Sequence, residues 1–160
     1  MFKRQLFLAA SMAFAATTLN AGIQVPAAVV GDGYGDIGPA LTGIPGFAAR
    51  GEARTLTPGT SHCVACGQVD QLAEHGFLGK AGPSPDGIGA RWDEGALRGI
   101  MLRADAVFPE TMEFALYGTT GFNRSGGGLD GQTNEGPVEP RLTARDIEDV
   151  AANLMTLTEC

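Results

Sequence analysis

The chain has 160 residues, of which 44% are hydrophobic and 18% charged, and its formal net charge is −7 at pH 7. This length suits one domain with a hydrophobic core of its own. The acidic balance argues against nucleic acid or an anionic membrane surface as a partner, because both carry the same sign of charge. A basic protein or a small molecule is a better-matched partner.

Residues 1–21 have the order of a secretory signal peptide. Lys3 and Arg4 precede an apolar run that extends to about Ala16, and small residues follow before an expected cut after Ala21. The apolar run is too short to span a bilayer, and no later run is long and apolar enough to do so. We therefore expect an exported domain in a bacterial periplasm, with no membrane attachment and a net charge of −9 once the two basic residues are removed.

The residues that follow divide into an arm and a domain. Residues 22–44 are rich in glycine and proline and predict an extended N-terminal arm with little regular structure. The domain is expected to occupy residues 45–160. It should begin with a short helix in PGFAARGEARTL, opened by Pro45 and Gly46.

The segment SHCVACGQ (61–68) carries a chemical motif. Cys63 and Cys66 have the C-x-x-C spacing that attaches haem covalently in c-type cytochromes, and we expect them on a short helical turn. In such a motif the next residue is a histidine that binds the iron. Here the next residue is Gly67, so the scaffold of a haem site lacks its usual iron ligand.

An amphipathic helix is predicted after this motif. Residues 76–91 are loop-like, with five glycines and two prolines, and Asp93 then caps the first turn of the helix. The apolar residues of this helix recur at spacings of three and four and form one stripe: Trp92, Ala96, Leu97, Ile100, Met101 and Ala104.

The chain closes with a second amphipathic helix. A long flexible loop is expected over residues 118–140, and Thr143 with Asp146 then forms a T-x-x-D capping signal. The predicted buried face consists of Ile147, Val150, Ala151, Leu154 and Leu157. No internal repeat and no clear strand pattern is found. The sequence therefore predicts an all-α fold of short helices and long Gly/Pro-rich loops, wrapped around a large rigid cofactor.

Five ordered segments extend this interpretation. They are ARGEA ahead of the cysteines, CVAC, GP leading into DGIGARWDEGALRGI, FPETMEFALYGTTGF and LTARDIEDVAANLMTL. From about residue 45 to 158 the chain thereby resembles the SoxX family, the monohaem c-type cytochrome subunits of periplasmic SoxAX complexes in sulfur-oxidising bacteria. The resemblance implies a cytochrome c-like fold with one haem c, bound through thioethers to Cys63 and Cys66.

The resemblance also implies a function and partners. SoxAX complexes join thiosulfate oxidatively to a cysteine of a sulfur-carrier protein. The catalytic haem lies in the SoxA subunit, and the SoxX subunit accepts or relays electrons. We therefore expect a heterodimer with a SoxA-like cytochrome subunit, an indirect relation to the sulfur-carrier protein, and no catalysis by this chain alone.

The chain departs from the family pattern at both iron ligands. Gly67 stands at the proximal histidine position, and Glu113 stands at the distal methionine position, with Met112 one place earlier. In a loop that normally reads G-P-x-L, Pro85 takes the leucine position, and the carbonyl of Pro83 would accept the N–H of the missing histidine. If haem is attached, we expect Gly67 to leave an imidazole-sized gap and an open coordination position.

Several side chains are candidate replacements for the lost ligands. Met112 is the best distal candidate, because a one-residue slip of its loop would bring its sulfur to the iron. Glu113 is a second candidate, as an anionic oxygen ligand or simply as a solvated carboxylate. The remaining candidates fit ordinary surface or core roles better: His62, His75, Met101 and Met155.

Three other functions stay open at this stage. The chain can be a haem-free partner that keeps the fold and docks to a SoxA-like subunit. It can be a thiol-redox protein that uses Cys63 and Cys66 as a dithiol, although no thioredoxin-like strand pattern precedes them. A zinc site from these cysteines, Cys160 and a histidine is the least consistent, because the spacing matches no paired zinc pattern. The role of Cys160 is left open.

Overall fold

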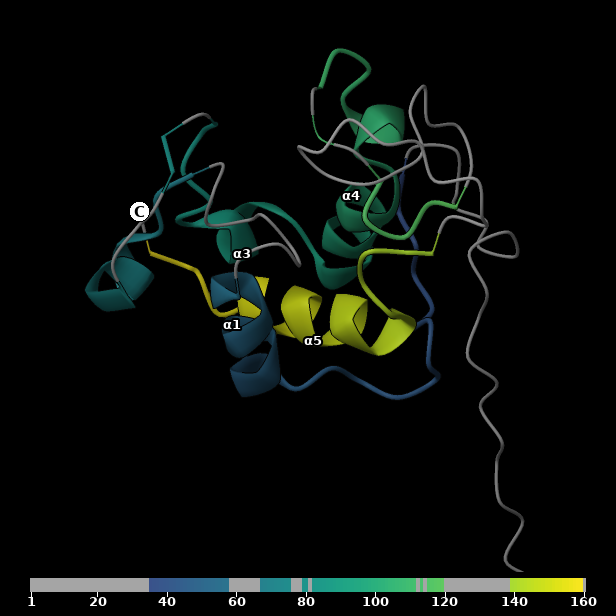
Figure 1. The fold of residues 1–160 in the computed structure, drawn as a ribbon, viewed down its shortest axis with the longest axis horizontal. Helices are drawn as coiled ribbons and strands as arrows, with labels where there is room; N and C mark the ends of the chain where they lie inside the picture. Colours follow the sequence, from purple (N-terminus) through teal and green to yellow (C-terminus); the bar gives the residue numbers. More distant parts are fainter. Residues whose placement is uncertain are drawn as a thin grey trace, which may run out of the picture.

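Helices make up the regular structure in the described part of the chain (Figure 1). The computed structural model describes residues 35–57, 67–75, 79–80, 82–111, 113, 115–119 and 139–159. Its elements in chain order are α1 (Ala48–Leu56), the 3₁₀ helix η2 (Asp70–His75), α3 (Ile88–Arg91), α4 (Glu94–Val107) and α5 (Ala144–Leu154). No strand occurs in these residues, and the all-α prediction is confirmed. No helix among them has the length and apolar content that a membrane crossing requires.

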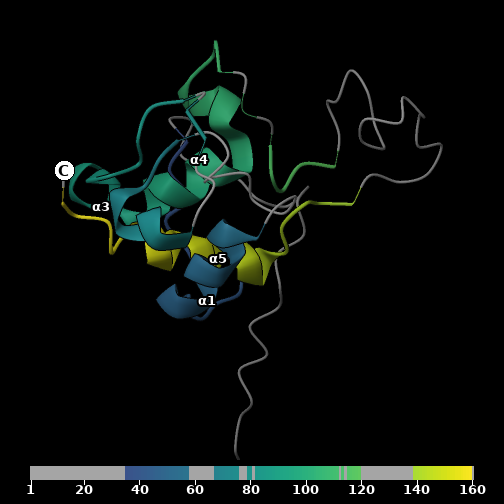
Figure 2. The same ribbon diagram turned by 60° about the vertical axis from the view of Figure 1, so that its left-hand side comes forward.

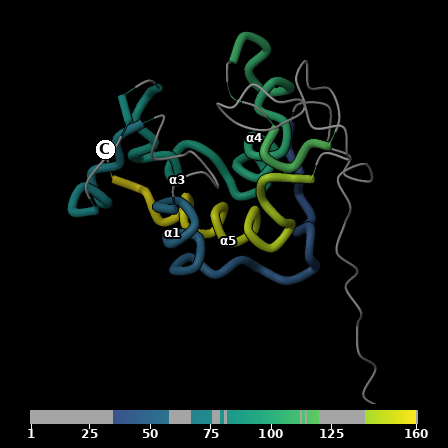
Figure 3. Tube along the Cα trace, viewed as in Figure 1, coloured from purple at the N-terminus to yellow at the C-terminus, as the bar shows by residue number. Residues whose placement is uncertain are grey.

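The last helix, α5, lies at the centre of the fold. Both α1 and α4 pack against it, and the tube view in Figure 3 shows the three helices together. The predicted apolar stripes supply a substantial part of the core, including Leu97, Met101, Ile147, Val150 and Ala151. Because a fully buried aliphatic side chain contributes about 1.5–3 kcal/mol, these two stripes are a large part of what holds the fold together.

The crossing of α1 and α5 depends on a glycine. A Cβ built on Gly51 would lie 1.8 Å from the carbonyl oxygen of Asp149 and 2.8 Å from Cβ of Asn153. Any side chain at this position would therefore push the two helices apart. Figure 2 shows α1 lying across α5, and the predicted crossing of the last helix with an earlier one is confirmed.

The predicted caps of α4 and α5 are present. The side chain of Asp93 accepts a hydrogen bond of 2.8 Å from the N–H of Ala96. Thr143 and Asp146 form a reciprocal capping box, in which each side chain accepts from the backbone N–H of the other residue. These interactions are local in sequence, which is why they were predictable.

The start of α1 is capped from a distance. The helix begins at Ala48, and its N-cap residue Phe47 makes no side-chain cap. Instead, the N–H of Phe47 donates to Oδ1 of Asp149 at 2.7 Å, so α5 supplies the missing acceptor. The expected start at Pro45 and Gly46 is thus a few residues early.

Two ion pairs join the same helices. Arg50 Nε lies 2.7 Å from Oδ2 of Asp149, and Arg54 Nε lies 2.6 Å from Oδ1 of Asp146. The Asp149 side chain is only 3% exposed, and burial alone would raise its pKa. The hydrogen bonds from Arg50 and from the Phe47 N–H outweigh burial and hold the pKa of Asp149 below its usual value.

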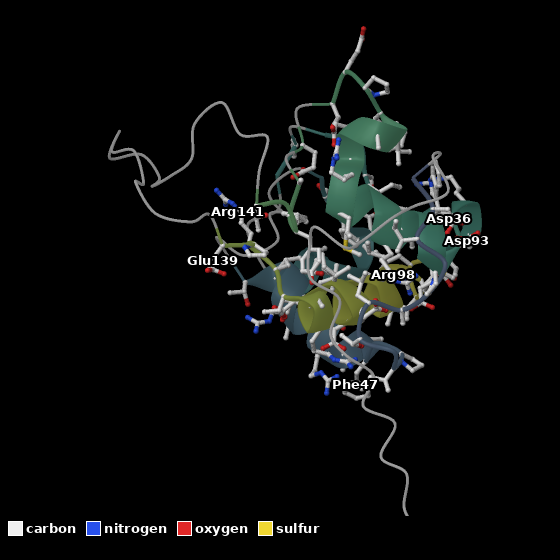
Figure 4. The ribbon with its side chains drawn as sticks, turned by 90° about the vertical axis from the view of Figure 1, so that its right-hand side faces the viewer. Asp36, Phe47, Asp93, Arg98, Glu139 and Arg141 are labelled. Carbon is white, nitrogen blue, oxygen red and sulfur yellow. The ribbon has the colours of Figure 1, made fainter. Side chains whose placement is uncertain are left out.

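A buried ion pair joins α4, α5 and the residues ahead of α1. Arg98 Nε and Nη2 lie 2.9 and 3.1 Å from the two carboxylate oxygens of Glu148, and the side chains are 3% and 0% exposed. Figure 4 shows Arg98 where α4 meets α5. Arg98 also donates to the carbonyl of Ile37, and the N–H of Leu41 donates to Glu148 Oε1 at 2.7 Å. Residues 35–44, the described part of the expected arm, are therefore packed onto the helices.

Two short helical segments lie where the sequence analysis expected none. The one-turn helix α3 falls inside the stretch 76–91 that was expected to be a loop, and η2 was not predicted. Gly87 precedes α3 with a φ of 68°, which glycine adopts without the steric cost that other residues incur. Helices this short depend on tertiary contacts rather than on a repeated apolar pattern.

Candidate functional site

The structure brings Gly67 and Pro83 into contact. Gly67 is buried, and a Cβ built on it would lie 2.3 Å from the carbonyl oxygen of Pro83. The same Cβ would lie 3.1 Å from Cδ of Pro85. The two residues that the sequence analysis placed on the proximal side therefore lie side by side, while their role toward a haem stays a prediction.

A hydrogen-bond network holds this contact together. Ser84 Oγ lies 2.7 Å from the carbonyl oxygen of Gln68 and 2.7 Å from Oδ2 of Asp86, and its single proton serves one of them at a time. The N–H of Asp70 donates to Oδ1 of Asp86 at 3.0 Å. These bonds are solvent-exposed, and each contributes on the order of 1 kcal/mol. Together they hold residues 67–70 against the loop of residues 83–86, which we call the proline loop.

The proline loop is also anchored to the core. The N–H of Ile88 donates to the carbonyl of Pro85 at 3.0 Å, which joins the loop to α3. The N–H of Gly89 in turn donates to the carbonyl of Leu157 at 2.9 Å. A Cβ on Gly89 would lie 2.5 Å from the carbonyl oxygen of Met155, so α3 packs directly on the chain that follows α5. Figure 1 shows the loop and α3 beside this end of α5.

The surroundings of Gly67 leave no room for a Cβ in the described residues, while the imidazole-sized gap toward a haem stays a prediction. The atom nearest to the Cβ position is a backbone carbonyl oxygen, which cannot rotate away as a flexible side chain can. The expectation assumed that removing a histidine leaves its space behind. In the structure, the loop of residues 83–86 lies against the place where such a side chain would begin. The residues on this side therefore do not fit a proximal side-chain ligand at position 67.

Glu113, at the family's distal position, lies on the segment that follows α4. It is partly buried, and its N–H donates to Oγ1 of Thr111 at 3.1 Å. The chain then returns to the core, where the N–H of Leu116 donates to the carbonyl of Met101 at 3.2 Å. Tyr117 is buried beside it, which raises the pKa of its hydroxyl. Figures 1 and 2 show residues 115–119 and residues 82–87 on different sides of the fold.

The other candidate ligands divide into described and undescribed residues. His75 is exposed at the end of η2, Met101 is buried in the core, and Met155 packs partly buried against it, as expected. Five candidates lie outside the described residues: His62, Cys63, Cys66, Met112 and Cys160. Within the described ranges, no three His, Cys, Asp or Glu side chains come together as a metal site.

Sequence analysis missed Ser84 and Asp86, which hold the proline loop. The pattern P-S-P-D contained a signal, because serine and aspartate beside proline favour turns with side-chain hydrogen bonds to the nearby backbone. It did not indicate that the partners are Gln68 and Asp70, which lie 16 residues earlier in the chain.

Comparison with known proteins agrees with this architecture. No family model matches the chain, and no curated protein matches it. A solved structure does match: the crystal structure of SoxXA from P. pantotrophus, with a TM-score of 0.80 and 39% sequence identity. The match covers 86% of this chain and 100% of that chain. Identity of this size over a complete solved chain indicates a shared family and not only a shared fold.

Proposed function

The chain belongs to the SoxX family of cytochrome subunits, and we propose that it is the periplasmic electron-transfer subunit of a thiosulfate-oxidising SoxAX-type complex. The observation that carries this proposal is the match to a SoxXA structure at 39% identity, over 86% of this chain and the whole of the solved chain. A SoxA-like cytochrome subunit is the proposed partner. The proposed relation to the sulfur-carrier protein is indirect, through that subunit.

The cofactor of this subunit is proposed to be one haem c. Cys63 and Cys66 supply the two thioether positions, and Gly67 supplies no axial ligand. Met112 and Glu113 are the proposed distal candidates. A bound haem would take up and pass on single electrons, and its potential would differ from that of a histidine-ligated haem, because axial-ligand identity is a main determinant of haem potential.

One observation supports a second function. Gly67 packs so closely on Pro83 that no side chain fits between them. A chain that no longer needs a proximal ligand can accept such packing and still keep its helical core. The alternative function is therefore a haem-free partner that docks to a SoxA-like subunit and contributes structure rather than a redox centre.

The absorption spectrum separates these functions. The full chain should be expressed in a host that attaches haem c, and purified from the periplasm. We expect a haem absorption band that survives denaturation and a mass increase of one haem, because thioether bonds are covalent. A Cys63→Ser/Cys66→Ser variant is the matched control and should carry neither signal. A parent protein without covalent haem that still binds a SoxA-like subunit would establish the alternative.

A further inference from the structure

Gly67 and Pro85 are two departures from the family pattern, and the structure places them in contact. In the sequence they are separated by 17 other residues and look like unrelated changes. In the fold, Cδ of Pro85 lies 3.1 Å from the position that a Cβ on Gly67 would take. The ring of Pro85 thus lies in tight contact with the place where a side chain at position 67 would begin.

The requirement for glycine at position 67 comes from contact and not from backbone conformation. The residues whose backbone is left-handed include Gly35, Gly43 and Gly87, and Gly67 is not among them. An alanine could therefore adopt its backbone angles. What excludes a side chain is the Pro83 carbonyl oxygen, 2.3 Å from the Cβ position, together with the Pro85 ring.

The loop has little freedom to move away. The rings of Pro83 and Pro85 fix two φ angles, and Pro85 restricts the preceding Ser84 to extended conformations. The hydroxyl of Ser84 is held at 2.7 Å from the carbonyl of Gln68. The backbone on both sides of Ser84 is thus restricted, and the Ser84 hydroxyl ties the loop to Gln68.

We infer that Gly67 and Pro85 are a matched pair that closes the proximal side of the site, so that restoring a ligand there requires changes at both positions. The inference deepens the proposed function, because position 67 has a meaning for haem only if the chain is a cytochrome subunit. The consequence is specific. A histidine at position 67 is not accommodated while the proline loop is intact, because its Cβ meets the Pro83 carbonyl oxygen.

A double-mutant cycle on the full purified chain tests the pair. The proteins are the parent, Gly67→Ala, Pro85→Ala and the double variant, and the measurement is the midpoint of urea denaturation. Without the contact, Gly67→Ala would stabilise the protein, because alanine reduces the freedom of the unfolded chain. With the contact, we expect Gly67→Ala to lower the midpoint by about 1 M. Replacing Pro85 removes Cδ and frees the loop. In the Pro85→Ala background, the fall in the urea midpoint caused by Gly67→Ala should therefore be smaller than in the parent, by about 0.3 M or more.

Two control variants separate the contact from general effects. Gly38→Ala tests glycine replacement where the nearest atom to the Cβ is 3.9 Å away, and it should not lower the midpoint comparably. Pro109→Ala tests the loss of a proline ring at an exposed turn. If Gly67→Ala is as stable as the parent, or costs equally with and without Pro85, the matched pair is refuted.

The same proteins distinguish this inference from the proposed function. The urea midpoints report on packing and need no haem. Absence of covalent haem in the parent would refute the electron-transfer function and leave the cycle intact. If the parent carries covalent haem, and the midpoint changes of Gly67→Ala and Pro85→Ala simply add in the double variant, the matched pair is refuted and the function is left intact. Gly67→His and Gly67→His/Pro85→Ala extend the test, since only the second is expected to accept its side chain without a large loss of stability.

Discussion

The buried pair of Arg98 and Glu148 should be among the most sensitive interactions of the fold. Glu148 is fully buried and accepts three hydrogen bonds, two from Arg98 and one from the N–H of Leu41. The change Glu148→Gln keeps the shape but removes the charge. Among the described residues, this leaves the guanidinium of Arg98, which is 3% exposed, with Glu94 at 3.3 Å as its charged partner.

The magnitude follows from this geometry. Removing one partner of a buried ion pair costs about 3–5 kcal/mol, because the remaining charge stays out of water without compensation. Domains have about 5–15 kcal/mol of total stability, so Glu148→Gln should remove a large share of it. Arg98→Met should cost a similar amount, since it leaves the carboxylate unpaired. The double variant should lose less than the sum of the two, with a coupling of about 2 kcal/mol.

Urea denaturation followed by circular dichroism measures these losses. The exposed pair of Arg103 and Asp105 is the matched control, because it has the same two-bond geometry at 2.8 and 2.7 Å. Its side chains are 63% and 51% exposed, and Asp105→Asn should cost less than about 1 kcal/mol. If Glu148→Gln costs no more than this control, the buried network does not hold the segment ahead of α1, and the reasoning is wrong.

The remaining predictions concern the helix crossing, its pH dependence and export. Gly51→Ala should lower the free energy of unfolding by about 1–3 kcal/mol, although alanine favours helices, because its Cβ meets the Asp149 carbonyl; urea midpoints equal to those of the parent would contradict this. The pKa of Asp149 is lower in the folded protein than in the unfolded chain. The stability that its carboxylate contributes is therefore fully present above the unfolded pKa of about 4, and it is lost as the pH falls through the folded pKa. Asp149→Asn should therefore be less stable than the parent at neutral pH, with a gap that closes under acid, and a gap independent of pH would argue against it. Intact mass of periplasmic protein should show cleavage near Ala21, and a mature chain that still begins at Met1 would exclude the signal peptide.

Local sequence signals predicted much of the helical framework. The cap at Asp93 and the capping box of Thr143 and Asp146 join residues three positions apart, so their hydrogen bonds can be recognised from spacing alone. The apolar stripes of α4 and α5 are equally local, because a helix places residues three and four apart on one face. The cysteine motif and the ordered family segments predicted the fold class in the same way, and the match to a SoxXA structure confirms the family.

Long-range contacts determined the rest. The start of α1 depends on Asp149, which lies 102 residues away from Phe47, and the buried charge of Arg98 depends on Glu148, 50 residues away. No spacing rule relates such positions, because only the packed fold places them together. The same reason explains the site. Gly67 alone indicated a position without a ligand side chain, whereas its close contact with the Pro83 carbonyl is visible only in the packed fold, since free space belongs to the packed chain and not to any single residue.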